Sequence, residues 1–326
     1  MLISCVLVLL AVAHNHALMG LPQENSPEDQ WFEQIRDHFN AINKWTWFQR
    51  YWESMEHYKP GGPAFIWIGG EWEENPTHMT DAQWYNWAEE NGAAMFLLEH
   101  RYYGQSRPTF DMSTENMIFL SSRQALQDLA HFMTAMNNKH NLTGSWITFG
   151  YSYAGSLSAW MSLKFPHLVA GSVASSAPLY SKLDFHEYLQ VVADALETTG
   201  SECLLAITEA FAAVEDLIKD KEKWDYLSTT FKLCKTLDGS NKMDVATFLS
   251  KLTAAVSTII QYNDNLDFDL SSICELMGDG TIGDPIQRLA VVVDFMRGSN
   301  ETSNLDGKLI FGHFLTIVLN LDSFTQ

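Results

Sequence analysis

Residues 146–155 read W-I-T-F-G-Y-S-Y-A-G, and a helical run, L-S-A-W-M-S-L-K, follows at 157–164. A short apolar run, a sharp turn at Ser152 and a helix come in the order of a nucleophile elbow. In an elbow the serine backbone is strained, and small residues two positions before and after it keep the strand and the helix from clashing. Gly150 and Ala154 are such residues. The stretch predicts that Ser152 is a nucleophile, with a turn of small residues and no chemistry as the alternative.

A second turn favours a hydrolase. Acyl transfer needs backbone N–H groups aimed at the developing oxyanion, one from the residue after the nucleophile and one from the loop after an earlier strand. The N–H of Tyr153 is the first candidate. Gly70 and Glu71 follow the apolar run at 64–68 and offer the second, although a tight turn alone also explains them.

The periodicity of the apolar residues divides the chain into two regions. Continuous apolar runs at 64–68, 94–98, 146–149 and 168–174 predict strands covered on both faces, as in an open α/β sheet. Between them, apolar residues at helical spacing over 126–136 predict a crossover helix capped by Ser121 or Ser122. After residue 190 helical spacing takes over, at 204–218 and again at 245–259. We expect a sheet domain over 28–190 and a helical insertion over 191–326.

The chain offers no convincing acid and base for Ser152. In this type of site the order along the chain is Ser, then Asp or Glu, then His. His167 and His186 come too early, and the best internal pair is Asp294 with His313. Asp294 lies among apolar residues at helical spacing, which indicates a position on a cap helix instead.

The N-terminal segment predicts export. Residues 2–13 form an apolar run of about a dozen residues, short of the ~18 that span a bilayer, and small residues at Ala11, Ala13 and Ala17 suit signal peptidase. We expect a signal peptide over 1–17, with a buried helix or membrane anchor as the alternative because no Lys or Arg precedes the run. No other apolar run is expected to span a membrane.

Export makes the cysteines and sequons informative. Cys203, Cys234 and Cys274 remain after signal removal, and this odd number leaves one without an intramolecular partner in the sequence given. Asn141 and Asn300 begin Asn-x-Thr sequons and are the expected glycosylation sites.

Charge and length exclude some functions. The 326 residues include 20 Lys+Arg and 40 Asp+Glu, a net charge of −20. This charge repels phosphate backbones and anionic lipid surfaces, so nucleic-acid binding is not expected. The length suffices for about two domains with a substantial core.

Further segments complete a recognisable pattern over residues 28–275. They include D-H-F-N at 37–40, T-W-F-Q-R-Y at 46–51, G-G-E at 69–71, L-E-H-R-Y-Y-G-Q-S at 98–106, L-S-S-R-Q-A-L at 120–126 and A-S-S-A-P at 174–178. With the elbow, this set resembles the prolyl carboxypeptidase and dipeptidyl peptidase II family of serine peptidases. Y-A-G-S-L at 153–157, L-K-F-P-H-L at 163–168 and L-D-F at 183–185 are most similar to its thymus-specific serine protease branch.

The resemblance implies an α/β-hydrolase fold whose sheet domain carries a helical, disulfide-stapled cap insertion. It implies that Ser152 is the nucleophile, that Tyr153 with Gly70 and Glu71 shapes the oxyanion hole, and that Cys203 pairs with Cys274. It further implies cleavage of peptides next to proline, in lysosomes, in endosomes or outside cells, by an enzyme that forms homodimers and needs no metal or cofactor.

Three departures from the family pattern modify this expectation. Tyr151 and Trp72 stand where the family usually has glycine, and Trp72 is expected to narrow the site. The family's catalytic Asp and His lie in a C-terminal sheet segment after the insertion, and the sequence given stops at Gln326, so we expect a sheet domain incomplete at its C-terminal side. The alternatives are a shortened product that binds peptides without cleaving them, and an esterase on the same fold.

Overall fold

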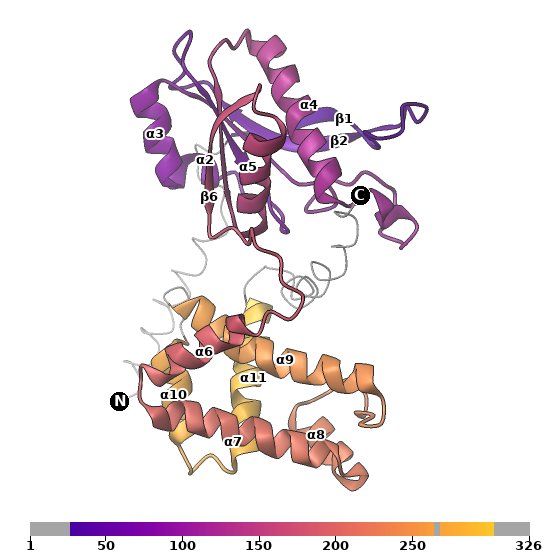
Figure 1. The fold of residues 1–326 in the computed structure, drawn as a ribbon, viewed down its shortest axis with the longest axis vertical. Coiled ribbons are helices and arrows are strands. Elements are labelled where there is room, and N and C mark those ends of the chain that lie inside the picture. The colour runs from indigo at the N-terminus through magenta and orange to yellow at the C-terminus, as the bar shows by residue number, and fades with distance from the viewer. Residues whose placement is uncertain (1–26, 264–267, 303–326) are drawn as a thin grey trace, which may run out of the picture. The chain divides into compact units, whose positions relative to one another are not determined.

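The computed structural model describes residues 27–263 and 268–302, which belong to two compact units divided between Ser181 and Lys182 (Figure 1). The first unit contains the sheet, and the second is helical. The boundary expected at residue 190 falls within α6 (Glu187–Glu197).

The sheet has six strands in the order β1-β2-β4-β3-β5-β6. β1 pairs antiparallel with β2 and β2 antiparallel with β4, whereas β3 is parallel to β4 and β5, and β5 is parallel to β6. An antiparallel hairpin at one edge of an otherwise parallel sheet, with an elbow at the end of β5, gives the α/β-hydrolase fold. The strands are β1 (Gln30–Ile35), β2 (Thr46–Ser54), β3 (Ala64–Ile68), β4 (Ala94–Leu98), β5 (Trp146–Tyr151) and β6 (Val169–Ser175).

Four of these strands confirm the sequence prediction. β3 and β4 have the predicted bounds, β5 extends two residues further, and β6 is shifted by one residue. The hairpin of β1 and β2 was not predicted. Its signal is the aromatic-rich run T-W-F-Q-R-Y-W-E-S of β2, in which exposed and buried residues alternate at the start.

Helices cover both faces of the sheet (Figure 1). Alternate residues of β3 divide between the faces: Ile66 and Ile68 pack with α4 and α5, and Phe65 packs with α3. The predicted crossover helix is α4, and the hydroxyl of Ser121 caps it by accepting the Gln124 N–H at 3.3 Å. The helices of this unit are α2 (His78–Asp81), α3 (Gln83–Asn91), η1 (Asn116–Phe119), α4 (Ser122–His140) and α5 (Ser152–Lys164).

The second unit packs its helices around a separate hydrophobic core. The predicted helices at 204–218 and 245–259 are confirmed as α7 and α9. The described helices are α6, α7 (Ser201–Ile218), η2 (Lys221–Lys223), α8 (Trp224–Thr230), α9 (Lys242–Gln261), α10 (Leu270–Gly278) and α11 (Pro285–Thr302).

One correction concerns membrane-spanning length. By length and composition alone, α9 is apolar enough to cross a bilayer, contrary to the expectation that no run after the signal segment would be. Its residues Phe248, Leu252 and Val256 are buried in the core of the helical unit. One face of α9 thus packs against the other helices of this unit.

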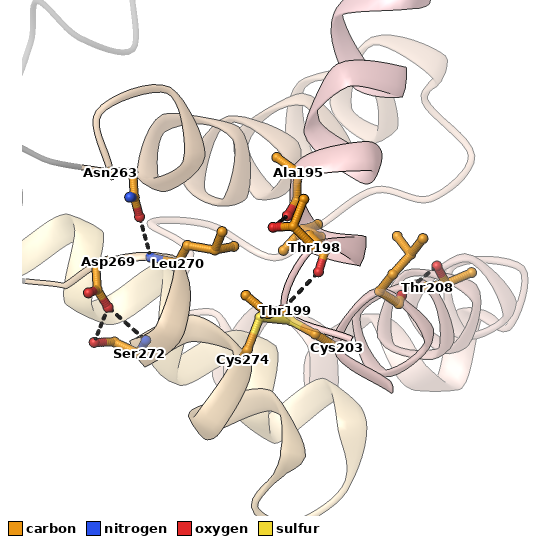
Figure 2. The surroundings of a disulfide bond; sticks show 12 residues. Ala195, Thr198, Thr199, Cys203, Thr208, Asn263, Asp269, Leu270, Ser272 and Cys274 are labelled. Carbon is orange, nitrogen blue, oxygen red and sulfur yellow. Dashed lines mark hydrogen bonds between the residues drawn. A yellow bond between two sulfur atoms is a disulfide. The ribbon is translucent and has the colours of Figure 1, made fainter. Parts of the chain in front are cut away.

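A disulfide joins α7 to α10 (Figure 2). Cys203 and Cys274, 71 residues apart in sequence, form the bridge that the family resemblance implied. The hydroxyl of Thr199 lies 3.0 Å from the sulfur of Cys274. Cys234 is a free, exposed thiol.

Candidate active site

Ser152 stands at the junction of β5 and α5 in a backbone conformation that serine rarely adopts. Its φ is +53°, in the left-handed region, where residues other than glycine are strained. β5 ends one residue before it and α5 begins with it. Strand, left-handed serine and helix in direct succession are the geometry of a nucleophile elbow.

Small residues make this junction possible. A Cβ at Gly150 would lie 2.2 Å from the carbonyl oxygen of Ala154, so no larger residue fits at position 150. A Cβ at Gly155 would lie 2.8 Å from the carbonyl oxygen of Ser175 in β6. Ala154 is itself fully buried. These residues let the first turn of α5 pack directly against β5 and β6.

The N-terminus of α5 presents the first candidate oxyanion donor. The first N–H groups of a helix have no partner within the helix and carry the positive end of its dipole. No side chain caps α5. The N–H of Tyr153 is therefore placed one residue after Ser152, without a capping side chain to occupy it.

The loop after β3 carries the second candidate donor. Gly69 donates its N–H to the Leu98 carbonyl at 2.9 Å, and a Cβ there would lie 2.7 Å from that oxygen. Gly70 donates its N–H to Oε1 of Glu74 at 3.2 Å. Of the pair named from the sequence, the Gly70 N–H is held by Glu74, whose own N–H is held by the buried Glu99. The Glu71 N–H donates to its own side-chain carboxyl, a partner that a substrate oxygen can displace, and is the second candidate.

Glu71 has an unusual carboxyl group. Burial raises its pKa to about 7, although a hydrogen bond from its own backbone N–H favours the ionised form. Burial likewise raises the pKa of the Tyr103 hydroxyl, and negative charge on Glu71 adds to this shift. A carboxyl that titrates near neutral pH therefore lies in the segment expected to shape the oxyanion hole.

A buried histidine fixes the Tyr153 side chain. Burial lowers the pKa of His100 to about 4, so its ring is neutral at neutral pH. Nδ1 lies 2.7 Å from the Arg101 carbonyl oxygen, which can only accept, so Nδ1 carries the proton. Nε2 then accepts a hydrogen bond from the hydroxyl of Tyr153 at 3.1 Å, which anchors the residue after Ser152 to the end of β4.

A buried charge network that the sequence pattern did not predict supports the loop after β3. Glu99 is fully buried and accepts from Arg50 Nη2 at 2.6 Å, from Ser106 Oγ at 2.7 Å and from the Glu74 N–H at 3.2 Å. Glu74 in turn holds the N–H of Gly70. The available signal was a charged E-H-R run directly after the apolar run 94–98.

A second network lies beside the first. Arg101 binds both carboxylate oxygens of Asp128 at 2.6 Å, and His38 Nε2 lies 2.8 Å from Asp128 Oδ1. All three side chains are nearly or fully buried. This His–Asp pair belongs to the α4 side of the core.

The candidate triad partners are not brought to Ser152. Among residues 27–263 and 268–302, no histidine or carboxylate makes a hydrogen bond to the Ser152 hydroxyl. Asp294 lies on α11, as its neighbours' spacing indicated, and pairs there with Lys232 and Arg297. His313 lies outside the described residues.

The other features predicted from the sequence are the two glycosylation sequons and the signal peptide. Asn141 is exposed in a left-handed conformation at the C-cap of α4. Asn300 falls within α11, but its side chain and the predicted signal peptide, residues 1–17, lie outside the described part of the structure. In that described part, no group of three or more His, Cys, Asp or Glu is arranged to hold a metal ion.

Comparison with known proteins identifies relatives along most of the chain. Human thymus-specific serine protease is 38% identical over 264 residues, covering 78% of this chain and 51% of that protein. The mouse protein is 40% identical over 262 residues, covering 77% of this chain and 51% of the relative. Human lysosomal Pro-X carboxypeptidase is 29% identical and covers 74% of this chain and 49% of the relative. The chain thus spans about half the length of the curated relatives it matches.

Two further findings complete the comparison. A crystal structure of proline iminopeptidase from Mycobacterium smegmatis aligns with a TM-score of 0.39 and 14% identity, over 74% of this chain and 73% of that one. The model of the serine carboxypeptidase S28 family matches residues 34–311. This match covers more than half of the chain, and the chain therefore belongs to the serine carboxypeptidase S28 family.

Proposed function

We propose that this protein is a serine-type exopeptidase in which Ser152 is the nucleophile. The observation that carries the proposal is the left-handed backbone of Ser152 at the junction of β5 and α5, in a chain of the S28 family. Such strain is retained at a junction where it exposes a side chain for chemistry.

The proposed reaction passes through an acyl-enzyme. Ser152 Oγ attacks the peptide carbonyl while a general base takes its proton, and collapse of the tetrahedral intermediate releases the amine product. Water then hydrolyses the ester. The oxyanion accepts hydrogen bonds from the N–H of Tyr153 and from the N–H of Glu71. At Glu71 the oxyanion takes the place of the Glu71 carboxylate as acceptor. Residues outside the described part supply the base.

The proposed substrates are peptides cleaved next to proline, and the proposed location is an exported compartment. Support for the substrate comes from the relative named lysosomal Pro-X carboxypeptidase. Support for export comes from the Cys203–Cys274 disulfide, because such bridges persist where thiols are not kept reduced. A homodimer and glycosylation at Asn141 and Asn300 belong to the same proposal.

The test uses the full-length protein, Xaa-Pro amide substrates and a fluorophosphonate probe that labels activated serines. We expect labelling and hydrolysis by the wild type and neither by Ser152→Ala. Ser162→Ala, a change on the same helix three turns away, should retain both. Labelling that survives Ser152→Ala would reject the nucleophile. Hydrolysis of acyl esters without hydrolysis of prolyl peptides would favour an esterase, and peptide binding without turnover would favour a binding protein.

A further inference from the structure

Two aromatic residues that depart from the family pattern contact each other beside the nucleophile. The rings of Trp72 and Tyr151 stack with their centroids 4.8 Å apart and their planes inclined by 26°. Trp72 comes from the loop after β3, one residue beyond Glu71. Tyr151 is the last residue of β5 and directly precedes Ser152. The stack therefore joins the two segments that carry the candidate oxyanion donors.

The indole of Trp72 also rests on the backbone of its own loop. A Cβ at Gly70 would lie 2.2 Å from Cη2 and 2.4 Å from Cζ3 of Trp72, so the ring lies directly against the Gly70 Cα. The indole thus contacts both the Gly70 backbone of this loop and the ring of Tyr151 in the elbow. A change in the separation of the two segments alters one of these contacts.

We propose that Trp72 and Tyr151 are positioning residues that set the distance between the N–H of Glu71 and the N–H of Tyr153. This inference rests on the proposed function. Oxyanion donors act at about 2.7–3.1 Å from the oxygen, and a misplacement of about 1 Å costs on the order of a hundredfold in rate. Stacked aromatic rings attract each other in a preferred geometry, so this contact restrains the two segments that carry the rings.

Bonds on the far side of the loop agree with this role. The Gly70 N–H is held by Glu74, and the Glu74 N–H is held by the buried Glu99. These bonds fasten the loop to the end of β4, and the Trp72–Tyr151 stack fastens it to the end of β5. The loop is thus held from both neighbouring strands of β3.

The experiment measures kcat and KM on an Xaa-Pro substrate with the full-length enzyme. Trp72→Ala should lower kcat about ten- to a hundredfold and change KM by less than about twofold, because the donors act mainly in the transition state. Trp72→Phe keeps a flat ring and should restore most of kcat. Tyr151→Ala should resemble Trp72→Ala, and the double variant should be little worse than either single one.

A matched stack on the same strand provides the control. Trp87 of α3 stacks on Phe149 of β5, with centroids 6.0 Å apart and an inclination of 29°, and neither residue belongs to the loop after β3. Trp87→Ala should lower the melting temperature but leave kcat unchanged. Melting temperatures show whether each variant is folded. If Trp72→Ala does not fold, the single variants Tyr151→Ala and Trp72→Phe provide the test.

The outcomes separate this inference from the proposed function. If Trp72→Ala or Tyr151→Ala keeps the wild-type kcat, raises only KM, or loses no more than Trp87→Ala, the positioning role is overturned. In that case Ser152→Ala still abolishes hydrolysis. If instead hydrolysis survives Ser152→Ala, the proposed function falls and the positioning role falls with it.

Discussion

Ser152 shows how the residues around a strained position make the strain tolerable. A left-handed conformation costs on the order of 1–3 kcal/mol for a residue with a Cβ. The cost is offset because Gly150 lets the first turn of α5 approach β5, and because Tyr153 is anchored through its hydroxyl to His100. The contacts of Gly150 and Tyr153, and not the intrinsic backbone preference of serine, keep Ser152 in the left-handed conformation.

Gly150→Ala tests this account. The added Cβ would lie 2.2 Å from the Ala154 carbonyl oxygen, which belongs to backbone and cannot turn aside. We expect the free energy of unfolding to fall by about 2–3 kcal/mol, measured by urea denaturation. Gly278→Ala is the control, because nothing lies within 4 Å of a Cβ there, and it should change stability by less than about 0.5 kcal/mol. Equal effects of the two variants would contradict the account.

Glu71 predicts a pH-dependent stability. Its carboxyl has a pKa of about 7 in the folded protein, raised by burial from 4.5. Because the folded state holds this proton more tightly than the unfolded state, the contribution is fully present below pH 4.5 and is lost as the pH rises to about 7. As the pH rises from 4.5 to 7, we expect the free energy of unfolding of Glu71→Gln to increase by about 2 kcal/mol relative to that of the wild type. This value is reduced for the partial exposure of the carboxyl to solvent.

Urea unfolding at both ends of this pH range measures the effect. Glu90→Gln, a change of an exposed carboxylate on α3, should follow the wild type throughout. If Glu71→Gln also runs parallel to the wild type, the Glu71 carboxyl titrates at its ordinary pKa in the folded protein.

The sequence could predict the residues of the elbow but not all of their partners. G-Y-S-Y-A combines small residues and a serine at fixed spacing, so the local backbone requirement is visible in the chain itself. The bond from Gly70 to Glu74 and the stack of Trp72 on Tyr151 join side chains whose directions depend on the loop conformation. No spacing rule encodes such contacts.

At the scale of elements, buried charge ties the middle of β2 to the segments that follow β3 and β4. Arg50 of β2 and Glu99, directly after β4, are almost fully buried, and Glu99 also binds the loops that follow β3 and β4. Burial raises the pKa of Glu99, and Arg50 opposes this shift by stabilising the ionised form. The pair therefore ties β2 to the loops that follow β3 and β4.

Arg50→Met tests the pair. Removal of one partner leaves the Glu99 carboxyl buried without its cation, which typically costs about 3–5 kcal/mol. The double variant Arg50→Met/Glu99→Leu should recover much of this loss, because no buried charge remains unpaired. Asp216→Ala breaks the exposed pair with Lys219 and should leave the urea midpoint close to that of the wild type. A loss in Arg50→Met no larger than in Asp216→Ala would refute the role of the buried pair.

Strands buried on both faces were predictable, whereas the edge hairpin was not. β3 and β4 are uninterrupted apolar runs, so composition alone marks them. β2 contains Gln49 and Arg50, which are buried but polar, because both are satisfied by partners distant in sequence. A polar residue in a strand is read as exposed until its partner is known, and this obscured β1 and β2.

At the scale of the whole molecule, the two units differ in what stabilises them. The sheet unit has a core on each face and two buried charge networks. The helical unit has one core and the disulfide. The probes available for them differ as well, since ten of the eleven tryptophans lie between residues 31 and 160 and only Trp224 lies in the helical unit.

This distribution allows the disulfide to be tested unit by unit. The bridge closes a loop with a sequence separation of 71, which corresponds to about 4 kcal/mol of chain entropy in the unfolded state, and both cysteines lie in the helical unit. We therefore expect Cys203→Ala/Cys274→Ala to lower the urea midpoint of the helical unit, followed by circular dichroism at 222 nm. Tryptophan emission, which reports mainly on the sheet unit, should keep its midpoint. Cys234→Ala removes the exposed free thiol and should move neither signal. If the tryptophan transition falls together with the helical one, the two units unfold as a single cooperative block, and the bridge stabilises more than the unit that contains it.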